Sequence, residues 1–193
     1  MSLERPASAL PGVRYGAVAR MTDSRGAFRE LWRADAFGIE PGDAGADPTT
    51  APTFVQANLS TSAPGVLRGL HYHQRQLDYW VVASGRAFVA LVDLRPVLDG
   101  SGGRPVVETR ELGEDGWVVI PAGVAHGFLA LEDATLVLYK CTEIHTPEAE
   151  RAVHYADAKI GIDWPLTPTL VAPKDAAAPP LEAAEFNFEY RPR

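Results

Sequence analysis

Short β-type segments follow one another along most of this 193-residue chain, and their regular spacing constrains the fold more than any other feature. Residues 86–94 alternate most clearly, which places Phe88 and Ala90 on one face of a strand and Val89 and Leu91 on the other. Strands at such spacing, without amphipathic helices between them, are typical of an antiparallel sandwich or barrel. The pattern predicts strands at 13–18, 53–58, 66–73, 79–83, 86–94, 106–112, 116–120, 126–131 and 135–142.

Several segments lie outside this pattern. We expect an N-terminal arm or edge strand at 1–12, a strand passing into a helical turn at 28–37, and a loop at 39–52. Further along, we expect a second helical turn at 147–151, an extended segment at 163–175 and a C-terminal tail at 176–193. In the tail, Phe186 and Phe188 are expected to pack on the barrel or on a partner. With a hydrophobic fraction of 46%, a chain of this length suits one domain over 1–193.

Charge and cysteine usage exclude several classes of protein. The net charge of −7 argues against a nucleic-acid binder, because that role needs a basic face to replace phosphate counterions. Cys141 is the only cysteine, so no intramolecular disulfide can form, which suits a reducing compartment. No apolar run approaches the roughly 20 residues that cross a bilayer, and no signal peptide is visible. We therefore expect a cytoplasmic protein without nucleic-acid or membrane partners.

A histidine-rich block carries the first chemical signal. His71 and His73 are two residues apart, so on a strand both rings face the same side. Asp78 follows within the same block, and a tight turn at 121–125 leads to His126. This spacing resembles the two motifs of the cupin superfamily, with Asp78 in the place of the usual Glu.

The cupin resemblance keeps one hypothesis open. In metal-binding cupins these positions coordinate one divalent ion, and imidazole with carboxylate suits Fe, Mn, Ni or Zn. The Asn expected four residues after the last histidine is Ala130 here. A metal-dependent oxygenase or isomerase would use His71, His73, Asp78 and His126.

A second series of short motifs runs along most of the chain. These are DSRG at 23–26, FVQAN at 54–58, LRGLHY at 67–72, VDLR at 92–95, IPAGVAHGF at 120–128, YK at 139–140 and PKD at 173–175. Each is weak alone. Together, in this order, they resemble the dTDP-4-dehydrorhamnose 3,5-epimerase family, and the chain is identified as a divergent member. The resemblance implies an all-β fold, a cupin-type jelly-roll β-barrel with short peripheral helices, and a homodimer with N-terminal strands exchanged or packed across it.

The resemblance also implies an activity, epimerisation at C3 and/or C5 of a dTDP-4-keto-6-deoxyhexose. A 4-keto group acidifies the protons beside it, so the reaction needs a base on one face and an acid on the other. His71 matches the base, Asp175 the carboxylate that orients it, and Tyr139 the acid. No cofactor or metal is implied. The implied substrate contacts are Arg25 and Arg68 on the diphosphate, Glu30 near the nucleotide, and Gln56, Asn58, His126 and Lys174.

Departures from the family pattern lie near the implied base. Asp78 stands where a Lys is expected close to the enolate oxygen, so either Arg75 or Lys174 supplies the charge or the electrophile differs. His73 stands where a Gln is common. A simpler interpretation of Asp78 is an ion pair with Arg75 or Arg68. The departures leave the epimerised carbon open, and a non-catalytic nucleotide-sugar-binding barrel is a further hypothesis.

Overall fold

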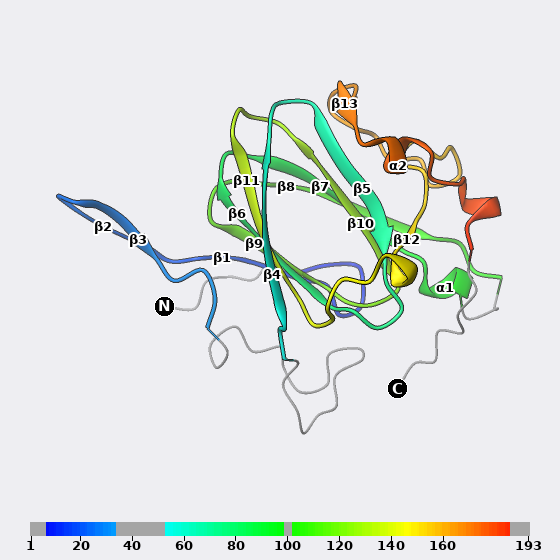
Figure 1. The fold of residues 1–193 in the computed structure, drawn as a ribbon, viewed down its shortest axis with the longest axis horizontal. Coiled ribbons are helices and arrows are strands. Elements are labelled where there is room, and N and C mark those ends of the chain that lie inside the picture. Colours follow the sequence, from blue (N-terminus) through cyan, green and yellow to red (C-terminus); the bar gives the residue numbers. More distant parts are fainter. Residues whose placement is uncertain (1–6, 34–52, 99–101, 186–193) are drawn as a thin grey trace.

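A computed structural model describes residues 7–33, 53–98 and 102–185, and most of its strands belong to two sheets (Figure 1). The first sheet has the strand order β1-β9-β6-β11-β4, and all of its neighbouring strands are antiparallel. Its strands are β1 (Arg14–Ala17), β4 (Gln56–Ser62), β6 (Asp78–Ser84), β9 (Gly116–Ile120) and β11 (Thr135–Cys141).

The second sheet has the order β12-β5-β10-β7-β8, and one further short strand, β13, pairs in parallel with β5. Its strands are β5 (Val66–Tyr72), β7 (Ala87–Asp93), β8 (Val106–Leu112), β10 (Val124–Ala130), β12 (Arg151–Ala152) and β13 (Leu170–Val171). The all-β jelly-roll prediction is confirmed: the sheets carry the fold and the helices beside them are short.

A hairpin and short helices complete the described chain. The hairpin of β2 (Arg20–Asp23) and β3 (Gly26–Arg29) projects away from the sheets in Figure 1. No helix in the described ranges has the length and apolar character needed to cross a membrane. The helices are α1 (Arg95–Leu98), α2 (Pro173–Ala176) and the 3-10 helices η1 (Pro147–Ala149) and η2 (Leu181–Ala183).

Alternation along the strands sorts side chains into separate cores, as the sequence predicts. Val89 and Leu91 of β7 lie in a cluster that also takes residues from the first sheet, so this cluster fills the space between the sheets. Ala90 faces the opposite side of β7, where residues of the C-terminal segment such as Ile160 cover it. Phe88, on the same outer side, contacts the ring of Trp164. The inner face of the second sheet is thus covered by the first sheet, and its outer face by the C-terminal segment.

Strands β5 and β10 approach closely at two glycines. Gly69 has φ +121°, and a Cβ placed there would lie 2.7 Å from the Cα of Gly127 and from the carbonyl oxygen of His126. A Cβ on Gly127 would meet the carbonyl oxygen of Arg68 at 2.6 Å. Glycine at both positions therefore permits the register in which His126 pairs with His71.

One strand is longer than its pattern predicts. β4 covers Gln56–Ser62, whereas the prediction was 53–58. The strand extends because each of its seven residues pairs with a residue of β11, so backbone pairing overrides the polar composition of its second half. The helical turn predicted within 28–37 is wrong for the described part, since β3 ends at Arg29 and residues 30–33 are not helical.

The terminal segments also differ from prediction. Leu10 is buried in the core, and the amide of Ala9 donates to Glu108, so residues 7–12 are anchored rather than loose. Residues 173–176 form a helical turn instead of an extended segment, because the fixed φ of Pro173 suits the first position of a helix. Residues 1–6, the predicted loop at 39–52, and Phe186 and Phe188 lie outside the described residues.

Candidate active site

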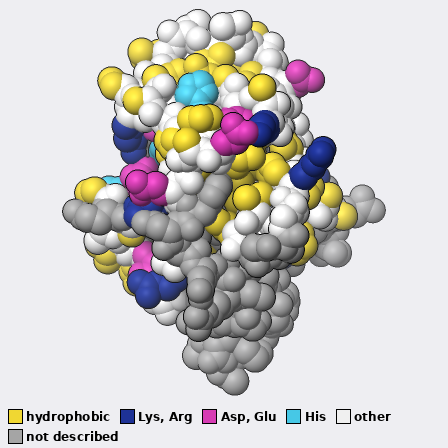
Figure 2. Space-filling view, turned by 90° about the vertical axis from the view of Figure 1, so that its right-hand side faces the viewer, with side chains coloured by type: hydrophobic (Ala, Val, Ile, Leu, Met, Phe, Trp, Pro, Cys, Tyr) yellow, Lys and Arg dark blue, Asp and Glu magenta, His cyan; other side chains and the backbone are white. Residues whose placement is uncertain are grey.

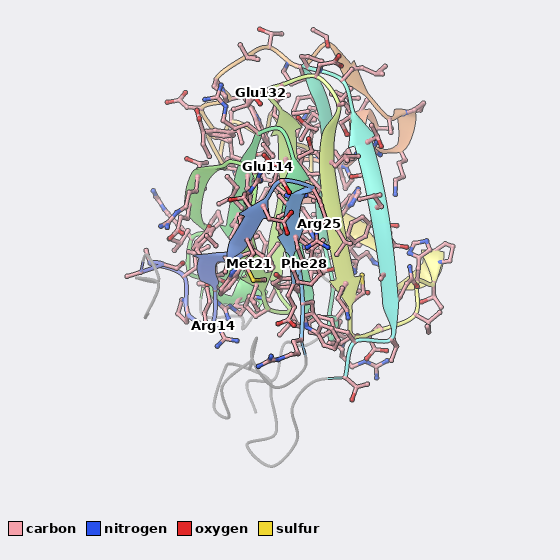
Figure 3. The ribbon with its side chains drawn as sticks, turned by 90° about the vertical axis from the view of Figure 1, so that its left-hand side faces the viewer. Arg14, Met21, Arg25, Phe28, Glu114 and Glu132 are labelled. Carbon is pink, nitrogen blue, oxygen red and sulfur yellow. The ribbon has the colours of Figure 1, made fainter. Side chains whose placement is uncertain are left out.

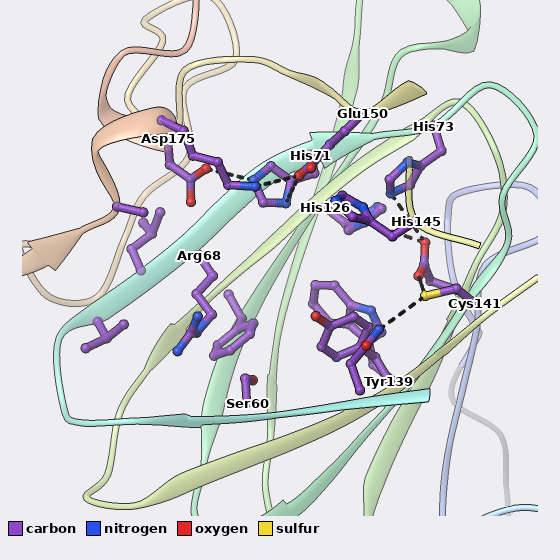
Figure 4. A pocket seen from close by; sticks show the side chains of 18 of the residues that line it. Ser60, Arg68, His71, His73, His126, Tyr139, Cys141, His145, Glu150 and Asp175 are labelled. Atoms are coloured by element: carbon purple, nitrogen blue, oxygen red, sulfur yellow. Dashed lines mark hydrogen bonds and ion pairs between the residues drawn. The ribbon is translucent and has the colours of Figure 1, made fainter. Parts of the chain in front are cut away.

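A cavity of about 560 Å³ opens between the sheets and is closed on one side by residues 170–175 (Figure 4). Its volume falls in the range of small-molecule sites. Strands of both sheets contribute side chains, so the lining is held by the most regular part of the fold. Of the residues singled out in the sequence, the lining includes Gln56, Asn58, Arg68, His71, His73, Asp78, His126, Tyr139, Lys174 and Asp175.

His71 and Asp175, 104 residues apart in sequence, form a hydrogen-bonded pair. The Nε2 atom of His71 lies 2.8 Å from Oδ1 of Asp175, and the amide of Gly69 donates to Oδ2 of the same carboxylate at 3.2 Å. The turn α2 places this carboxylate, which is 2% exposed, against β5. Burial raises the pKa of Asp175, but the hydrogen bonds from His71 and Gly69 outweigh it and lower the pKa below its usual value. Asp175 is therefore ionised at neutral pH.

A second carboxylate, Glu150, contacts the other ring nitrogen of His71, and the sequence did not indicate it. Its Oε1 lies 3.3 Å from Nδ1 of His71 and 2.9 Å from Nζ of Lys174. Burial opposes ionisation of Glu150, but Lys174 and His71 together lower its pKa. No motif marked this residue. Its position follows from the pairing of β12, which begins at Arg151, with β5.

Tyr139 lies on β11, on a different side of the cavity from His71 (Figure 4). Its register partners are Trp80 on β6 and Asn58 on β4, and its ring is tilted against that of Trp80. Burial is the largest cause that raises the pKa of Tyr139. The phenol is therefore protonated at neutral pH and able to donate a proton.

His73, Asp78 and His126 form a compact group in the same cavity. Oδ2 of Asp78 lies 3.8 Å from Nε2 of His73 and 3.7 Å from Nε2 of His126. Burial lowers the pKa of both histidines, that of His126 to about 4, so both rings are neutral near pH 7. Of the four residues considered as metal ligands from the sequence, this group brings together three, and His71 is not among them.

The partners of Asp78 also differ from the expected ion pair with an arginine. Nε2 of Gln76 donates to both carboxylate oxygens at 3.1 Å, and Sγ of Cys141 donates to Oδ1 at 3.2 Å. Arg68 instead donates to Ser62 and to a backbone carbonyl of β4. Arg75 is exposed and is not among the lining residues.

Lys174 and Arg75, the two candidates for the missing positive charge, do not lie beside Asp78. Lys174 is paired with Glu150 near the cavity mouth, with its side chain 63% exposed. Lys174 therefore lines the cavity on the side of His71, and the wall of the cavity around Asp78 carries His73 and His126.

Two residues predicted to bind substrate lie away from this cavity. Arg25 is at the tip of the β2–β3 hairpin, where its side chain is 88% exposed and pairs with Asp23 (Figure 3). Glu30 is exposed and pairs with Arg33. Within one chain, the structure does not bring either residue to the site.

Comparisons with known proteins agree with this geometry. A family model described as dTDP-4-dehydrorhamnose 3,5-epimerase matches residues 7–183. The chain is 39% identical over 183 residues to the dTDP-4-dehydrorhamnose 3,5-epimerase of Neisseria gonorrhoeae, covering 92% of this chain and 52% of that protein. It therefore spans about half the length of that relative. The enzyme of the same name from Pseudomonas aeruginosa is 40% identical over 162 residues, with 82% and 84% covered.

Solved structures give the same result. The dTDP-6-deoxy-D-glucose-3,5-epimerase of Legionella pneumophila, in complex with dTDP-4-keto-L-rhamnose, superposes with a TM-score of 0.81 at 31% identity, and the match covers 100% of both chains. The similarity thus extends over the two sheets and the segment that closes the cavity.

Proposed function

The chain belongs to the dTDP-4-dehydrorhamnose 3,5-epimerase family, and from this premise we propose that it epimerises a dTDP-4-keto-6-deoxyhexose at C3, at C5 or at both. The observation that carries the proposal is the position of the His71–Asp175 pair and of Tyr139 around one cavity. A relative with the same fold binds dTDP-4-keto-L-rhamnose, a sugar of the class that the proposal requires.

Proton removal is assigned to His71. The ionised Asp175 orients the ring of His71, and the ring takes the proton from the carbon beside the ketone. The electron pair of the broken C–H bond moves onto the ketone oxygen and forms an enolate. The imidazolium that results lies between Asp175 and Glu150, and both carboxylates stabilise its charge.

Reprotonation is assigned to Tyr139. Inversion requires that the new proton arrive on the face opposite to the one from which it left. The phenol O–H of Tyr139 donates that proton to carbon, and the enolate returns to the ketone. The phenolate then recovers a proton from solvent, and the His71 imidazolium releases one to solvent. Because the reaction moves only protons, it needs no oxidant and no nicotinamide.

Substrate binding uses the polar wall of the cavity. Gln56 and Asn58 are amide donors and acceptors on β4, and their side chains hydrogen-bond to each other at 3.1 Å. The guanidinium of Arg68, which is exposed, faces the cavity in Figure 4 and suits a diphosphate. His126 and Lys174 complete the set of contacts proposed from this chain.

A second copy of the chain is proposed to complete the site. Met21 and Phe28 are register partners on the hairpin and are 55% and 65% exposed, which is unusual for two large apolar side chains at one place. The hairpin points away from its own sheets (Figure 1). A homodimer in which each hairpin packs on the other copy would cover this pair and carry Arg25 toward the partner's cavity.

The proposed setting is the cytoplasm, without nucleic-acid or membrane partners. A net charge of −7 supports this assignment because it disfavours binding to phosphate backbones and to anionic lipid surfaces.

Deuterium exchange tests the activity directly. The full chain is incubated with dTDP-4-keto-6-deoxyglucose in D₂O, and deuterium at C3 and C5 is followed by NMR. Incorporation at one or both carbons, with inversion there, is the expected result, and the labelled position identifies the carbon. Binding of the nucleotide sugar with no exchange at either carbon, for this and related dTDP-4-keto sugars, would instead establish a non-catalytic binding barrel.

A further inference from the structure

The group of His73, Asp78 and His126 has the geometry of a ligand set. One donor atom from each residue lies within 4.8 Å of the other two. The separations of 3.7 and 3.8 Å between Oδ2 of Asp78 and the two Nε2 atoms are longer than hydrogen bonds, so these atoms face one another across a gap. Two ligands bound to one metal ion at about 2.1 Å and a tetrahedral angle are about 3.4 Å apart. The two separations from Asp78 exceed this value by a few tenths of an ångström, and none in the group exceeds 4.8 Å, so side-chain shifts would close the group around an ion.

Hydrogen bonds behind these residues orient their donor atoms. Nδ1 of His126 lies 2.9 Å from the carbonyl oxygen of Val124 and donates to it, which leaves the lone pair on Nε2, the atom that faces Asp78. Gln76 and Cys141 donate to Asp78 and fix the plane of its carboxylate. Such outer contacts are typical of metal sites, where they set the tautomer and direction of each ligand.

The charge of the group favours a cation. The side chain of Asp78 is only 3% exposed, and its described contacts are with an amide, a thiol and two imidazoles, with no lysine or arginine among them. A buried carboxylate without a positive partner is costly to keep ionised. A bound divalent ion would remove this cost and would use all three donors at once.

We propose that His73, Asp78 and His126 bind one first-row divalent transition-metal ion, such as Zn²⁺ or Fe²⁺, in the wall of the cavity. Two imidazoles and one carboxylate suit these ions and leave coordination positions open. The ion's role rests on the proposed function: it would supply the positive charge that an enolate oxygen requires.

The other permanent cations among the described lining residues do not supply that charge. Lys174 is paired with Glu150, and Arg68 donates to Ser62. In Figure 4, Arg68 and the histidine pair lie on opposite sides of His71.

Metal binding is measured first and without reference to activity. The full chain is dialysed against EDTA and titrated with Co²⁺, with d–d absorption and calorimetry as readouts. One equivalent of Co²⁺ per chain is expected to bind and to give visible d–d bands. Asp78→Asn and His73→Gln are each expected to weaken binding by more than about 100-fold, since loss of outer contacts alone costs about 10- to 100-fold.

Two further variants make the test decisive. Gln76→Leu keeps all three ligands and removes a contact behind Asp78, so it is expected to weaken binding by about 10- to 100-fold. His154→Gln removes a histidine that stacks on Tyr155 outside the cavity, and it should bind Co²⁺ like the unaltered chain. Circular dichroism checks that each variant is folded. No saturable binding, or equal affinity in the unaltered, Asp78→Asn and Gln76→Leu chains, overturns the proposed site.

The metal site and the epimerase proposal fail in different ways. Equal deuterium exchange by metal-free and metal-loaded protein removes the ion's role at the enolate and leaves the epimerase proposal standing. Stoichiometric Co²⁺ binding without any exchange contradicts the epimerase proposal and leaves the site standing. Restoration of exchange by metal, in the unaltered chain and not in Asp78→Asn, supports both.

Discussion

At the scale of single residues, His71 and Tyr139 are assigned the two halves of one reaction on opposite faces of the substrate. His71 has carboxylates at both ring nitrogens, Asp175 at 2.8 Å and Glu150 at 3.3 Å, and so is suited to accept a proton. Tyr139 remains protonated because burial raises its pKa, and so is suited to donate one. Separate roles allow the two steps to be separated by substitution.

Tyr139→Phe is expected to reduce inversion by about 100- to 10,000-fold, the usual contribution of a positioned acid. Proton removal by His71 remains in this variant, so deuterium should still enter from D₂O on the original face. His71→Asn removes the base and should reduce exchange and inversion together. NMR of recovered substrate and product measures both quantities. If Tyr139→Phe reduces exchange as strongly as inversion, Tyr139 is not the separate acid.

The motifs located most of these side chains, because each candidate lies on or beside a strand whose register follows from alternation. Glu150 was missed, since its contact with His71 depends on where the chain returns after β11, which no local pattern encodes. The partners of Asp78 were also missed. Pairing of Cys141 with Asp78 across β11 and β6 is a long-range register that the sequence does not show.

At the scale of elements, the close approach of β5 and β10 sets the register in which His71 and His126 lie side by side. The approach depends on Gly69, which needs positive φ and also leaves no room for a Cβ. Gly26 has nearly the same φ, +126°, with nothing within 4 Å of a Cβ placed there. The two glycines therefore separate the cost of backbone strain from the cost of a clash.

Gly69→Ala is expected to lower the free energy of unfolding by about 2 kcal/mol or more beyond the loss in Gly26→Ala. Both variants carry the strain of an L-residue at this φ, about 1–3 kcal/mol, but Gly69→Ala also pushes β5 away from β10. Urea denaturation at one fixed protein concentration measures both. Equal losses in the two variants would show that strand separation is not limited by Gly69.

A cluster of arginines and acids fixes the base of the hairpin. Arg20 and Arg29 each donate to Asp115 at 2.8 Å, and both also contact Glu114. Burial raises the pKa of Asp115, but its hydrogen bonds to the two arginines outweigh this and lower the pKa. A carboxylate with a lowered pKa in the folded state stabilises the protein above its unfolded pKa, near 3.9, and loses that effect as pH falls through the folded pKa.

Asp115→Asn is therefore expected to lower the free energy of unfolding by about 1 kcal/mol at pH 7, and by less as the pH falls below about 4. Asn tolerates the positive φ of 76° at this position, so the substitution changes charge more than backbone conformation. Unfolding free energies of both proteins at pH 7, 4 and 3 give the comparison. A difference that stays constant over this range would mean that the ion pairs do not contribute.

Elements were predictable where alternation is strong and were not where pairing or proline geometry decides. The interior strand β7 and the edge strand β8 lie where the pattern places them. The length of β4 depends on its pairing with β11, whereas local composition favoured a shorter strand. The helical turn α2 depends on Pro173, whereas local composition favoured an extended segment.

At the scale of the whole molecule, the role that the sequence implies for Arg25 does not fit its position within a single chain. Its family match assigns it to the diphosphate, yet its side chain is 88% exposed on a hairpin that extends away from the sheets, and it is not among the lining residues of the cavity. The apolar side of the hairpin, around Phe28, is also exposed, and Figure 2 shows other apolar side chains scattered over a different face. The homodimer that the family resemblance implies would reconcile both observations.

Mixed dimers test whether Arg25 acts in the partner's site. Arg25→Ala and His71→Asn chains, each weakly active alone, are unfolded, mixed in equal amounts and refolded. In a mixed dimer the Arg25→Ala chain keeps its own His71 and receives Arg25 from its partner, so one of two sites is complete. Random pairing makes half of the dimers mixed, and recovery of about a quarter of the unaltered exchange rate is expected.

A matched mixture excludes recovery by refolding alone. His71→Asn and Asp175→Asn both alter the site of their own chain, since His71 and Asp175 contact each other within one chain. Their mixed dimers contain no complete site and should stay at the activity of the separate variants. If the Arg25→Ala mixture also shows no recovery while sedimentation confirms dimers, Arg25 does not serve the neighbouring cavity, and the hairpin's contribution is limited to covering its apolar side chains.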